Sequence, residues 1–393
     1  MKKVMILGAG IYQVPLIKQA KAMGIYTIVV SIRGNYPGFE IADKVYYEDT
    51  TDYNVVLEIA KKEKIDGIVT AGTDVAVITI GKVCDTLGLK GLSFEAANIA
   101  SNKMLMKEKY EEYGVRTARF RKVPFDVETI INETASLRFP LIFKAVDTSG
   151  SRGIIRVNSV DEFADAMQYT RSATKLDYFI VEEFLEGDEF GAQAFVYNGK
   201  IQFILPHGDY VFTGDTGVPI GHYAPFDLGD YIIKDAEIQL GKAIDAMGLD
   251  NCAINADFIL VDGQCYVLEL GGRSGATCLA ELTSIYYGFN YYEKLLLACM
   301  GEDVSFESDE CIPNASMLLM SEKDGKIISQ TNNNNNDDER IVDVQFDYKP
   351  GDIVHKFKVG PHRIGHIITK GKTLTEAVEV LNESLEKIVI KVD

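Results

Sequence analysis

The sequence lacks the features that mark several common classes of protein. None of its six cysteines belongs to a CxxC pair or has a histidine at metal-ligand spacing, unlike a zinc site or a redox dithiol. No apolar run approaches the roughly 18 residues of a membrane-spanning helix, and the N-terminal apolar run is too short for a secretory signal. We therefore expect a cytoplasmic protein without membrane contact. Apolar neighbours predict buried, reduced thiols at Cys84, Cys252, Cys265, Cys278, Cys299 and Cys311.

Positive charge is also scarce. The 393 residues include 58 acidic and 40 basic side chains, which gives a formal net charge of −18. Such a surface repels nucleic acid and anionic membranes except at local basic patches, so we expect no nucleic-acid partner. An anionic small substrate would need local arginines and lysines. The length allows two or three domains.

A complete dinucleotide-binding fingerprint is missing as well. Gly8-Ala9-Gly10 follows an apolar strand predicted at residues 4–7, but Gln13 stands in the place of the third glycine. The second predicted strand ends in Ser31-Ile32-Arg33 instead of an acid that could bind a ribose hydroxyl. A nicotinamide-dependent oxidoreductase is therefore only a weakly supported alternative.

The first hundred residues alternate between strand and helix patterns. Apolar strands at 4–7, 26–32 and 67–70 are separated by segments with apolar residues at helical spacing. This alternation predicts a parallel sheet covered by helices, so the fold class is α/β. The loop Ala71-Gly72-Thr73-Asp74 follows a strand at the edge where ligands bind in such folds. It is either a substrate contact or a helix N-cap.

Residues 255–277 have the most informative pattern in the chain. Two runs of β-branched, aromatic and aliphatic residues flank Asp262-Gly263, which predicts a hairpin with a tight turn. Asp257 and Glu269 would then face each other on adjacent strands. Two opposed carboxylates repel unless a cation lies between them, and oxygen ligands of this kind suit Mg²⁺. The alternative is a pair of solvated surface carboxylates.

A glycine-flanked arginine follows the hairpin. Arg273 lies among Gly271, Gly272 and Gly275, where the backbone can approach a ligand closely. The guanidinium offers a bidentate fork for a carboxylate or a phosphate. We also expect a helix over residues 276–287, whose N-terminus would lie beside this anion site.

Two lysines stand where an unpaired positive charge is unfavourable. Lys103 opens the helix predicted over residues 101–113, where the helix dipole disfavours a cation. Lys144 lies inside an apolar strand and needs a partner. The glycine- and serine-rich turn at 147–153 follows and exposes backbone N–H groups that can bind phosphate oxygens. Taken alone, a turn of this kind is more often a simple β-hairpin turn than a phosphate loop.

In their order and spacing, these lysines, the glycine-rich turn and the hairpin resemble the ATP-grasp superfamily. Its members join a carboxylate to an amine or another nucleophile through an acyl-phosphate. The resemblance covers essentially the whole chain and implies an ADP-forming ligase that binds ATP and Mg²⁺, with Mn²⁺ as the alternative metal. Its partners would be a small carboxylate and a small amine. The candidate reactions are phosphoribosylamine–glycine ligation or a related purine step, amino-acid or peptide ligation, and the use of bicarbonate.

The resemblance also implies roles for individual residues. Lys103 and Lys144 would bind the nucleotide phosphates, and Asp257 with Glu269 would bind the metal. The remaining nucleotide contacts would be Ser149, Gly150, Ser151 and Gly153 in the turn, Glu182, Glu183, Phe184 and Leu185 at an adenine hinge, and Glu189 at the ribose.

Two arginines would act on the reacting groups. Arg152 would neutralise the charge of the transferring phosphoryl group, and Arg273 would orient the substrate or the intermediate. One residue departs from the family pattern, because Gly271 stands where members have an Asn two residues after the second carboxylate. The third metal contact is therefore in doubt. A regulatory ATP-binding protein of the same fold is the alternative function.

The same resemblance divides the chain into three domains. Residues 1–98 would form the N-terminal α/β domain and residues 99–300 the ATP-grasp domain, with a mobile lid at about 116–179. Residues 301–393 would form a small C-terminal α+β domain. A homodimer is compatible with this organisation.

One long polar segment precedes the hairpin. Residues 206–225 are rich in glycine, proline and polar residues, which predicts a loop of a length that is often functional. His207 and His222 are candidate acid–base groups in this loop, although loop histidines are more commonly solvated or structural.

Overall fold

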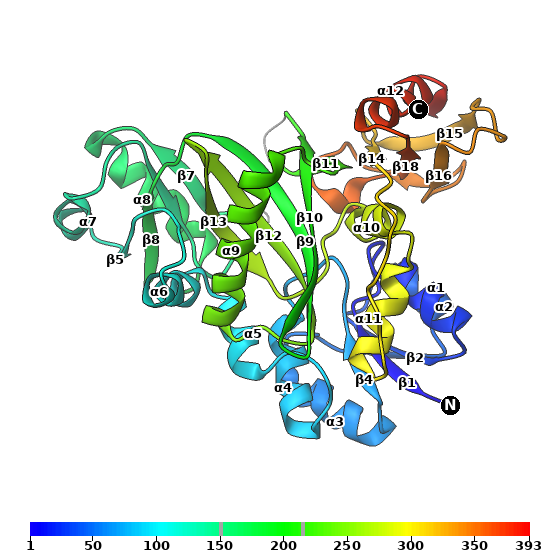
Figure 1. Cartoon of the computed structure of the whole chain (residues 1–393), viewed down its shortest axis with the longest axis horizontal. Helices are drawn as coiled ribbons and strands as arrows, with labels where there is room; N and C mark the ends of the chain where they lie inside the picture. Colours follow the sequence, from blue (N-terminus) through cyan, green and yellow to red (C-terminus); the bar gives the residue numbers. More distant parts are fainter. Residues whose placement is uncertain (149–151, 214–216) are drawn as a thin grey trace.

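The computed structural model describes residues 1–148, 152–213 and 217–393. Within these ranges the strands form four sheets. In Figure 1 a small antiparallel sheet lies at the left, the largest sheet runs from the middle to the upper right, and the N-terminal sheet lies at the lower right. None of the described helices has both the length and the apolar character needed to cross a membrane.

The N-terminal segment forms the predicted parallel sheet, in the order β3-β2-β1-β4. Helices cover both faces, because the strands are apolar on both sides. Residues from α1 and α11 pack on one face, and residues from α3 and α4 pack on the other. The elements are β1 (Lys3–Leu7), α1 (Val14–Ala22), β2 (Tyr26–Ser31), α2 (Gly38–Ile41), β3 (Lys44–Tyr47), α3 (Tyr53–Glu63), β4 (Gly67–Val69), α4 (Val77–Leu87) and α5 (Phe94–Ala100).

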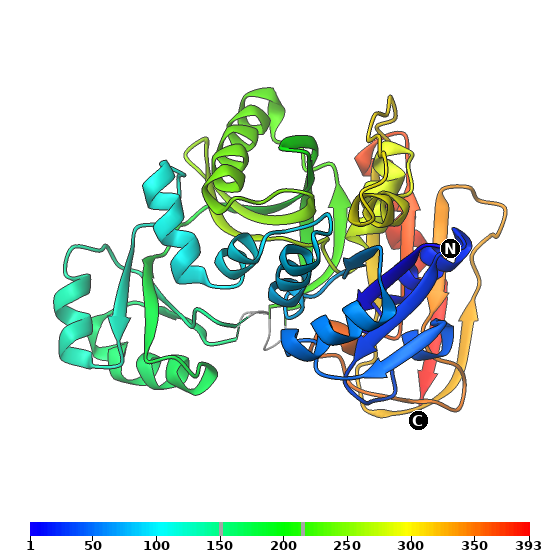
Figure 2. The same cartoon turned by 90° about the horizontal axis from the view of Figure 1, so that it is seen from below.

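Helix α6 (Lys103–Tyr113) leads into the small antiparallel sheet, in the order β5-β8-β6-β7. Its core is aromatic, because the ring of Phe143 contacts the rings of Phe163 and Phe179. The ring centroids are 5.1 Å apart in each pair. This sheet lies at the end of the molecule opposite the termini (Figure 2). The elements are β5 (Phe120–Pro124), α7 (Val127–Thr134), β6 (Leu141–Lys144), β7 (Ile154–Val157), η1 (Val160–Glu162), α8 (Phe163–Ala173) and β8 (Tyr178–Glu183).

The largest sheet has eight strands, in the order β13-β12-β9-β10-β11-β14-β18-β16. The predicted hairpin is present, and its turn residues Asp262 and Gly263 both have positive φ, as a two-residue hairpin turn requires. One face packs on α9 (Gly229–Met247). The strands are β9 (Asp188–Tyr197), β10 (Lys200–Val211), β11 (Pro219–Ala224), β12 (Cys252–Val261), β13 (Gln264–Gly271), β14 (Asn314–Leu319), β16 (Ile341–Phe346) and β18 (Gly365–Lys370).

The C-terminal residues extend this sheet, because β14 pairs with β11. A second, three-stranded sheet has the order β17-β15-β19. Helices α10 and α11 lie between the largest sheet and the N-terminal sheet (Figure 1). These remaining elements are α10 (Leu279–Tyr287), α11 (Tyr291–Cys299), β15 (Gly325–Asn332), β17 (Ile353–Val354), η2 (Gly360–His362), α12 (Leu374–Leu385) and β19 (Ile388–Val392).

Three local predictions are wrong. The segment predicted as a loop at 206–225 contains the second half of β10 and all of β11, which pair with each other, with β9 and with β14. Helix α10 begins at Leu279 instead of residue 276, because Thr277 and Cys278 have φ of 54° and 70° and cannot continue a right-handed helix. Five cysteines are buried as free thiols, but Cys311 is exposed.

Candidate functional site

The polar residues of the candidate site share one face of the largest sheet. Glu269 of β13 pairs with Asp257 of β12, so the predicted opposition of these carboxylates is confirmed. Gly191 of β9 pairs with Asp257 on one side and with His207 of β10 on the other. Directly paired residues point to the same face of a sheet. The four positions therefore form a row across β13, β12, β9 and β10.

Asp257 is a carboxylate without an adequate counter-charge. Asp257 is exposed, but the protein around the carboxylate and the negative charges of Glu269 and Asp209 raise its pKa to about 7, with Arg273 offsetting part of the effect. A divalent cation between Asp257 and Glu269 would remove this repulsion. Carboxylate oxygens on adjacent strands are the hard donors that Mg²⁺ prefers, so this pair fits a magnesium ion.

Two lysines on one face of α6 reach two different carboxylates. Lys103 Nζ donates to Glu269 Oε1 at 3.0 Å and to the carbonyl of Thr148 at 2.7 Å. Lys107, four residues later and thus on the same side, lies 3.4 Å from Glu182 Oε1 and donates to the hydroxyl of Thr117. Sequence analysis identified Lys103 but missed Lys107, whose spacing from Lys103 was the available signal.

Glu182 is buried between two lysines. Lys144 Nζ contacts its Oε2 at 2.8 Å, opposite the approach of Lys107 to Oε1. Burial alone would raise the pKa of Glu182, but the two lysines lower it below its ordinary value. Burial lowers the pKa of Lys107 to about 8 despite the attraction of Glu182. Within the described residues Glu182 Oε1 is buried and has no hydrogen-bond donor with good geometry.

The two glutamates of the predicted hinge have different surroundings. Glu183 follows Glu182 on β8 and therefore points to the opposite face. Its carboxylate accepts hydrogen bonds from Arg119 at 2.9 Å and from the backbone and side chain of Arg138 at 3.0 and 3.1 Å. Glu183 thus stabilises the small sheet and lies away from Lys144.

The structure describes only some of the other residues that were predicted to contact the nucleotide. Ser149, Gly150 and Ser151 lie outside the described residues. Arg152 is exposed. Gly153 has φ of 68°, and a Cβ there would lie 2.6 Å from that of Ala173, which explains the glycine. The hinge residues Phe184 and Leu185 are half-buried after β8, and Glu189 is exposed near the start of β9, two residues before Gly191 and on the same face.

The guanidinium of Arg273 is already bonded within the protein. Its Nε and Nη2 donate to the two oxygens of Asp74 at 2.7 and 3.0 Å. The expectation of a free bidentate fork is therefore corrected. The loop with Asp74 is also joined to this segment by a hydrogen bond from the N–H of Gly72 to the carbonyl of Ser274, at 3.2 Å. This contact connects the N-terminal domain to the end of the hairpin.

Gly271 makes room for this contact. A Cβ at Gly271 would lie 3.2 Å from Asp74 Oδ1. The carboxylate of Asp74 therefore occupies space beside the position from which the family's Asn would project. Where family members have the Asn side chain, this chain has a carboxylate oxygen of Asp74 close to Gly271.

His207 and His222 lie in strands rather than in the predicted loop, and both are buried. Their Nδ1 atoms lie 2.9 and 2.6 Å from the same oxygen of Asp209. Asp209 is two residues from His207 on β10 and pairs with His222 on β11. All three side chains therefore share the face with Asp257. Sequence analysis missed Asp209, although its i, i+2 spacing from His207 is a strand signal.

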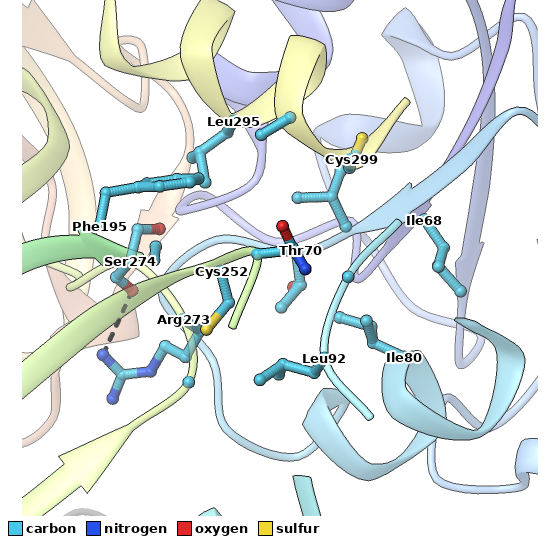
Figure 3. A pocket seen from close by; sticks show the side chains of 16 residues that line it. Ile68, Thr70, Ile80, Leu92, Phe195, Cys252, Arg273, Ser274, Leu295 and Cys299 are labelled. Carbon is cyan, nitrogen blue, oxygen red and sulfur yellow. Dashed lines mark hydrogen bonds between the residues drawn. The ribbon is translucent and has the colours of Figure 1, made fainter. Parts of the chain in front are cut away.

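The cavity shown in Figure 3 is lined by none of the lysines and carboxylates described above. It lies between β4, β12 and α11, and apolar side chains such as Ile68, Leu92, Phe195 and Leu295 form most of its lining. Arg273 contributes the only charged side chain among its lining residues. Such a surface suits packing between the N-terminal and central parts and does not suit phosphate.

The Gly8-Ala9-Gly10 turn is filled by protein. Gln13 Oε1 accepts the N–H of Gly10 at 2.9 Å, and its Nε2 donates to the carbonyl of Ala71. A dinucleotide pyrophosphate would need that N–H and that space. The geometry therefore disfavours the oxidoreductase alternative.

Two family models match parts of the chain. Residues 137–281 match the ATP-grasp domain, and residues 317–393 match the L-amino acid ligase C-terminal domain 2. The chain is similar to the crystal structure of phosphoribosylglycinamide synthetase from Anaerococcus prevotii, with 37% identity, complete coverage of both chains and a TM-score of 0.88.

Two further relatives are more distant. The formate-dependent phosphoribosylglycinamide formyltransferase of Methanocella arvoryzae is 25% identical over 82% of this chain and 79% of the relative. The alanine–anticapsin ligase of Bacillus subtilis is 24% identical over 67% of this chain and 62% of the relative. The order of motifs, the site geometry and these similarities lead to one conclusion: the chain belongs to the ATP-grasp family of ATP-dependent ligases.

Proposed function

We propose that the protein is an ADP-forming ligase that activates a small carboxylate as an acyl-phosphate for attack by an amine. One observation is its main support. Glu182, enclosed by Lys107 and Lys144, and the pair Asp257–Glu269 are linked through the two lysines of α6. The arrangement provides cations for phosphate oxygens and carboxylates for a metal within one site.

The nucleotide would lie between the small antiparallel sheet and the largest sheet. Lys144 and Lys103 would contact phosphate oxygens and exchange their present carboxylate partners for the ligand. Glu182 Oε1 would accept a hydrogen bond from the adenine amino group, while Glu189 would bind the ribose hydroxyls. We assign no nucleotide contact to Glu183, because Arg119 and Arg138 occupy its carboxylate.

Asp257 and Glu269 would hold magnesium, with Mn²⁺ as an alternative. Bound there with ATP, the ion would neutralise phosphate charge. Arg152 would add positive charge near the transferring group. Since phosphoryl transfer depends on positioning and electrostatics, these residues would account for most of the rate gain. The three-domain division at 98 and 300 and the mobility of the lid at 116–179 are part of this proposal.

The substrates would bind beside the segment after the hairpin. Arg273, fixed by Asp74, would present its remaining N–H groups to the carboxylate or to the acyl-phosphate. The relatives' names suggest two substrate types, a phosphoribosyl compound and an amino acid. We propose a small carboxylate and an amine of one of these types, used in the cytoplasm. A homodimer is also proposed, on the family resemblance.

The test is magnesium-dependent ADP release from pooled small carboxylates, with hydroxylamine present to convert any acyl-phosphate into a hydroxamate. The proposal predicts hydroxamate in one pool, and subdividing the pool identifies the carboxylate. Glu269→Gln is the matched control and should form none. ATP binding without hydroxamate from any pool would support the regulatory alternative, for which Gly271 is the structural argument.

A further inference from the structure

We propose that Asp209, fixed by His207 and His222, binds the cationic amine group of the second substrate. The inference rests on the ligase function proposed above and adds the group that recognises the nucleophile. Neither the nucleotide roles nor the metal roles use this cluster of three side chains.

The hydrogen bonds define the protonation of the cluster. Gln193 Oε1 accepts the N–H of Gly275 at 2.9 Å, so Gln193 Nε2 is the amide donor. That donor lies 3.3 Å from His207 Nε2, which must therefore accept. The proton of neutral His207 is then on Nδ1, directed at Asp209 Oδ1. His222 Nδ1 reaches the same oxygen.

Asp209 keeps its negative charge in this arrangement. Two neutral imidazoles orient a carboxylate without cancelling its charge. The surrounding protein favours the neutral acid, but His222 and His207 lower the pKa of Asp209 well below its ordinary value. Burial lowers the pKa of His222, even though Asp209 opposes this. Asp209 is therefore a carboxylate that two imidazoles hold in one orientation.

The open end of the cluster is Asp209. Its side chain is 30% exposed, whereas both imidazoles are only 3% exposed. Both histidine contacts use Oδ1, and Oδ2 accepts no hydrogen bond from the described part of the chain. A ligand donor can therefore bind Oδ2 without displacing a group of the described residues.

The position of Asp209 suits the attacking amine. Asp209 lies two residues after His207 on β10, and His207 and Asp257 both flank Gly191, so the two carboxylates share one face of the sheet. Asp209, Asp257 and Glu269 together repel a free anion, and a cation is the complementary ligand. An ammonium on Oδ2 would lie next to the place where the acyl-phosphate forms, and it would release one proton to solvent before its nitrogen attacks the acyl carbon.

The same three groups are near enough to hold a divalent metal, and the distances favour hydrogen bonds. With zinc–ligand bonds of about 2.1 Å, two tetrahedral ligands lie roughly 3.4 Å apart. The two nitrogen–oxygen distances in the cluster are 2.9 and 2.6 Å. Protons between the atoms explain these separations better than a metal does.

The test is Asp209→Asn, assayed with the identified amine and separately with hydroxylamine. Asn keeps an oxygen that accepts from both imidazoles but removes the charge. We expect KM for the amine to rise roughly 10- to 100-fold, as for the loss of a charged hydrogen bond. Hydroxamate formation should stay within about twofold, because hydroxylamine is largely uncharged at neutral pH. The matched control is Asp343→Asn, which changes the Asp343–His366 pair on the same sheet and should alter neither.

A second pair of variants covers the case in which Asp209→Asn does not fold. His222→Gln keeps an N–H donor for Asp209, and His222→Leu removes it, so only Leu should raise KM for the amine. Equal loss of amide and hydroxamate in Asp209→Asn would overturn the inference. So would an unchanged KM, or a stoichiometric transition metal that the wild type holds and the variant releases. Absence of hydroxamate in the wild type would instead reject the ligase function, and this inference with it.

Discussion

Glu182 and Asp257 are carboxylates of one site in opposite electrostatic situations. Glu182 has two lysines against its two oxygens, and its pKa is lowered despite burial. Asp257 faces Glu269 and Asp209, and its pKa is raised. The charge around Glu182 is balanced by the protein alone, whereas Asp257 needs a cation from outside. The difference indicates which half of the site is complete before ligands bind and which half is not.

The largest expected effect follows from removing the unbalanced charge. Asp257→Asn should lower ligase activity about 10³-fold, because metal binding supplies several kcal/mol of charge stabilisation. The same substitution should raise the melting temperature of the magnesium-free protein, since repulsion with Glu269 is relieved. Thermal melts with and without Mg²⁺ and ATP measure both effects. A lower melting temperature without magnesium would contradict the comparison.

The next largest effect concerns Glu182, whose charge is balanced by lysines of the protein. Lys144→Met keeps the length of the side chain but removes a cation from Glu182 and from the nucleotide. The dissociation constant for ATP should rise roughly 10- to 100-fold, as expected for a charge-assisted contact. Calorimetry measures it, with Lys122→Met as control, because Lys122 lies in the same sheet over the ring of Tyr178. An unchanged constant would remove Lys144 from the nucleotide site.

Replacing Lys107 tests whether the contacts of Glu182 with its lysines stabilise the folded protein. Lys107→Met should lower the free energy of unfolding by about 1–3 kcal/mol, because Glu182 loses one partner and Thr117 loses a donor. Folded Lys107 has a pKa of about 8, below the ordinary 10.5. Between these values the unfolded chain binds a proton that the folded chain does not, so the stability of the wild type relative to Lys107→Met should rise with pH. Denaturant unfolding between these two pH values measures the difference in stability between the two proteins. If Lys107 were not buried, that difference would not change with pH.

The smallest effect comes from restoring the family residue at position 271. Gly271→Asn adds an oxygen near Asp257 and Glu269 and crowds Asp74. The magnesium concentration for half-maximal activity should fall about two- to fivefold, while KM for the carboxylate should rise as Asp74 shifts from Arg273. Activity titrations measure both. No change in either would mean that Asp74 does not occupy the space left by the Asn.

Sequence patterns predicted the parts of the site that are local. The Asp-Gly turn predicted the hairpin, but Asp257 lies opposite Glu269 only because of a β-bulge between Asp257 and Phe258, since the turn alone would pair Asp257 with Leu268. The contact of Arg273 with Asp74 joins residues 199 positions apart, and no pattern in either segment specifies it. The strands with His207 and His222 were missed because glycine and proline interrupt them, and because the second strand is held in part by β14, about a hundred residues away. Lys107 was missed because polar residues on a helix are usually solvated.

The most direct test of the central claim follows one oxygen atom. With the carboxylate identified and labelled with ¹⁸O, ligation should transfer one labelled oxygen to inorganic phosphate for each amide formed, because the acyl-phosphate bond contains that oxygen. Phosphate without label, together with amide product, would contradict an acyl-phosphate and with it the proposed function.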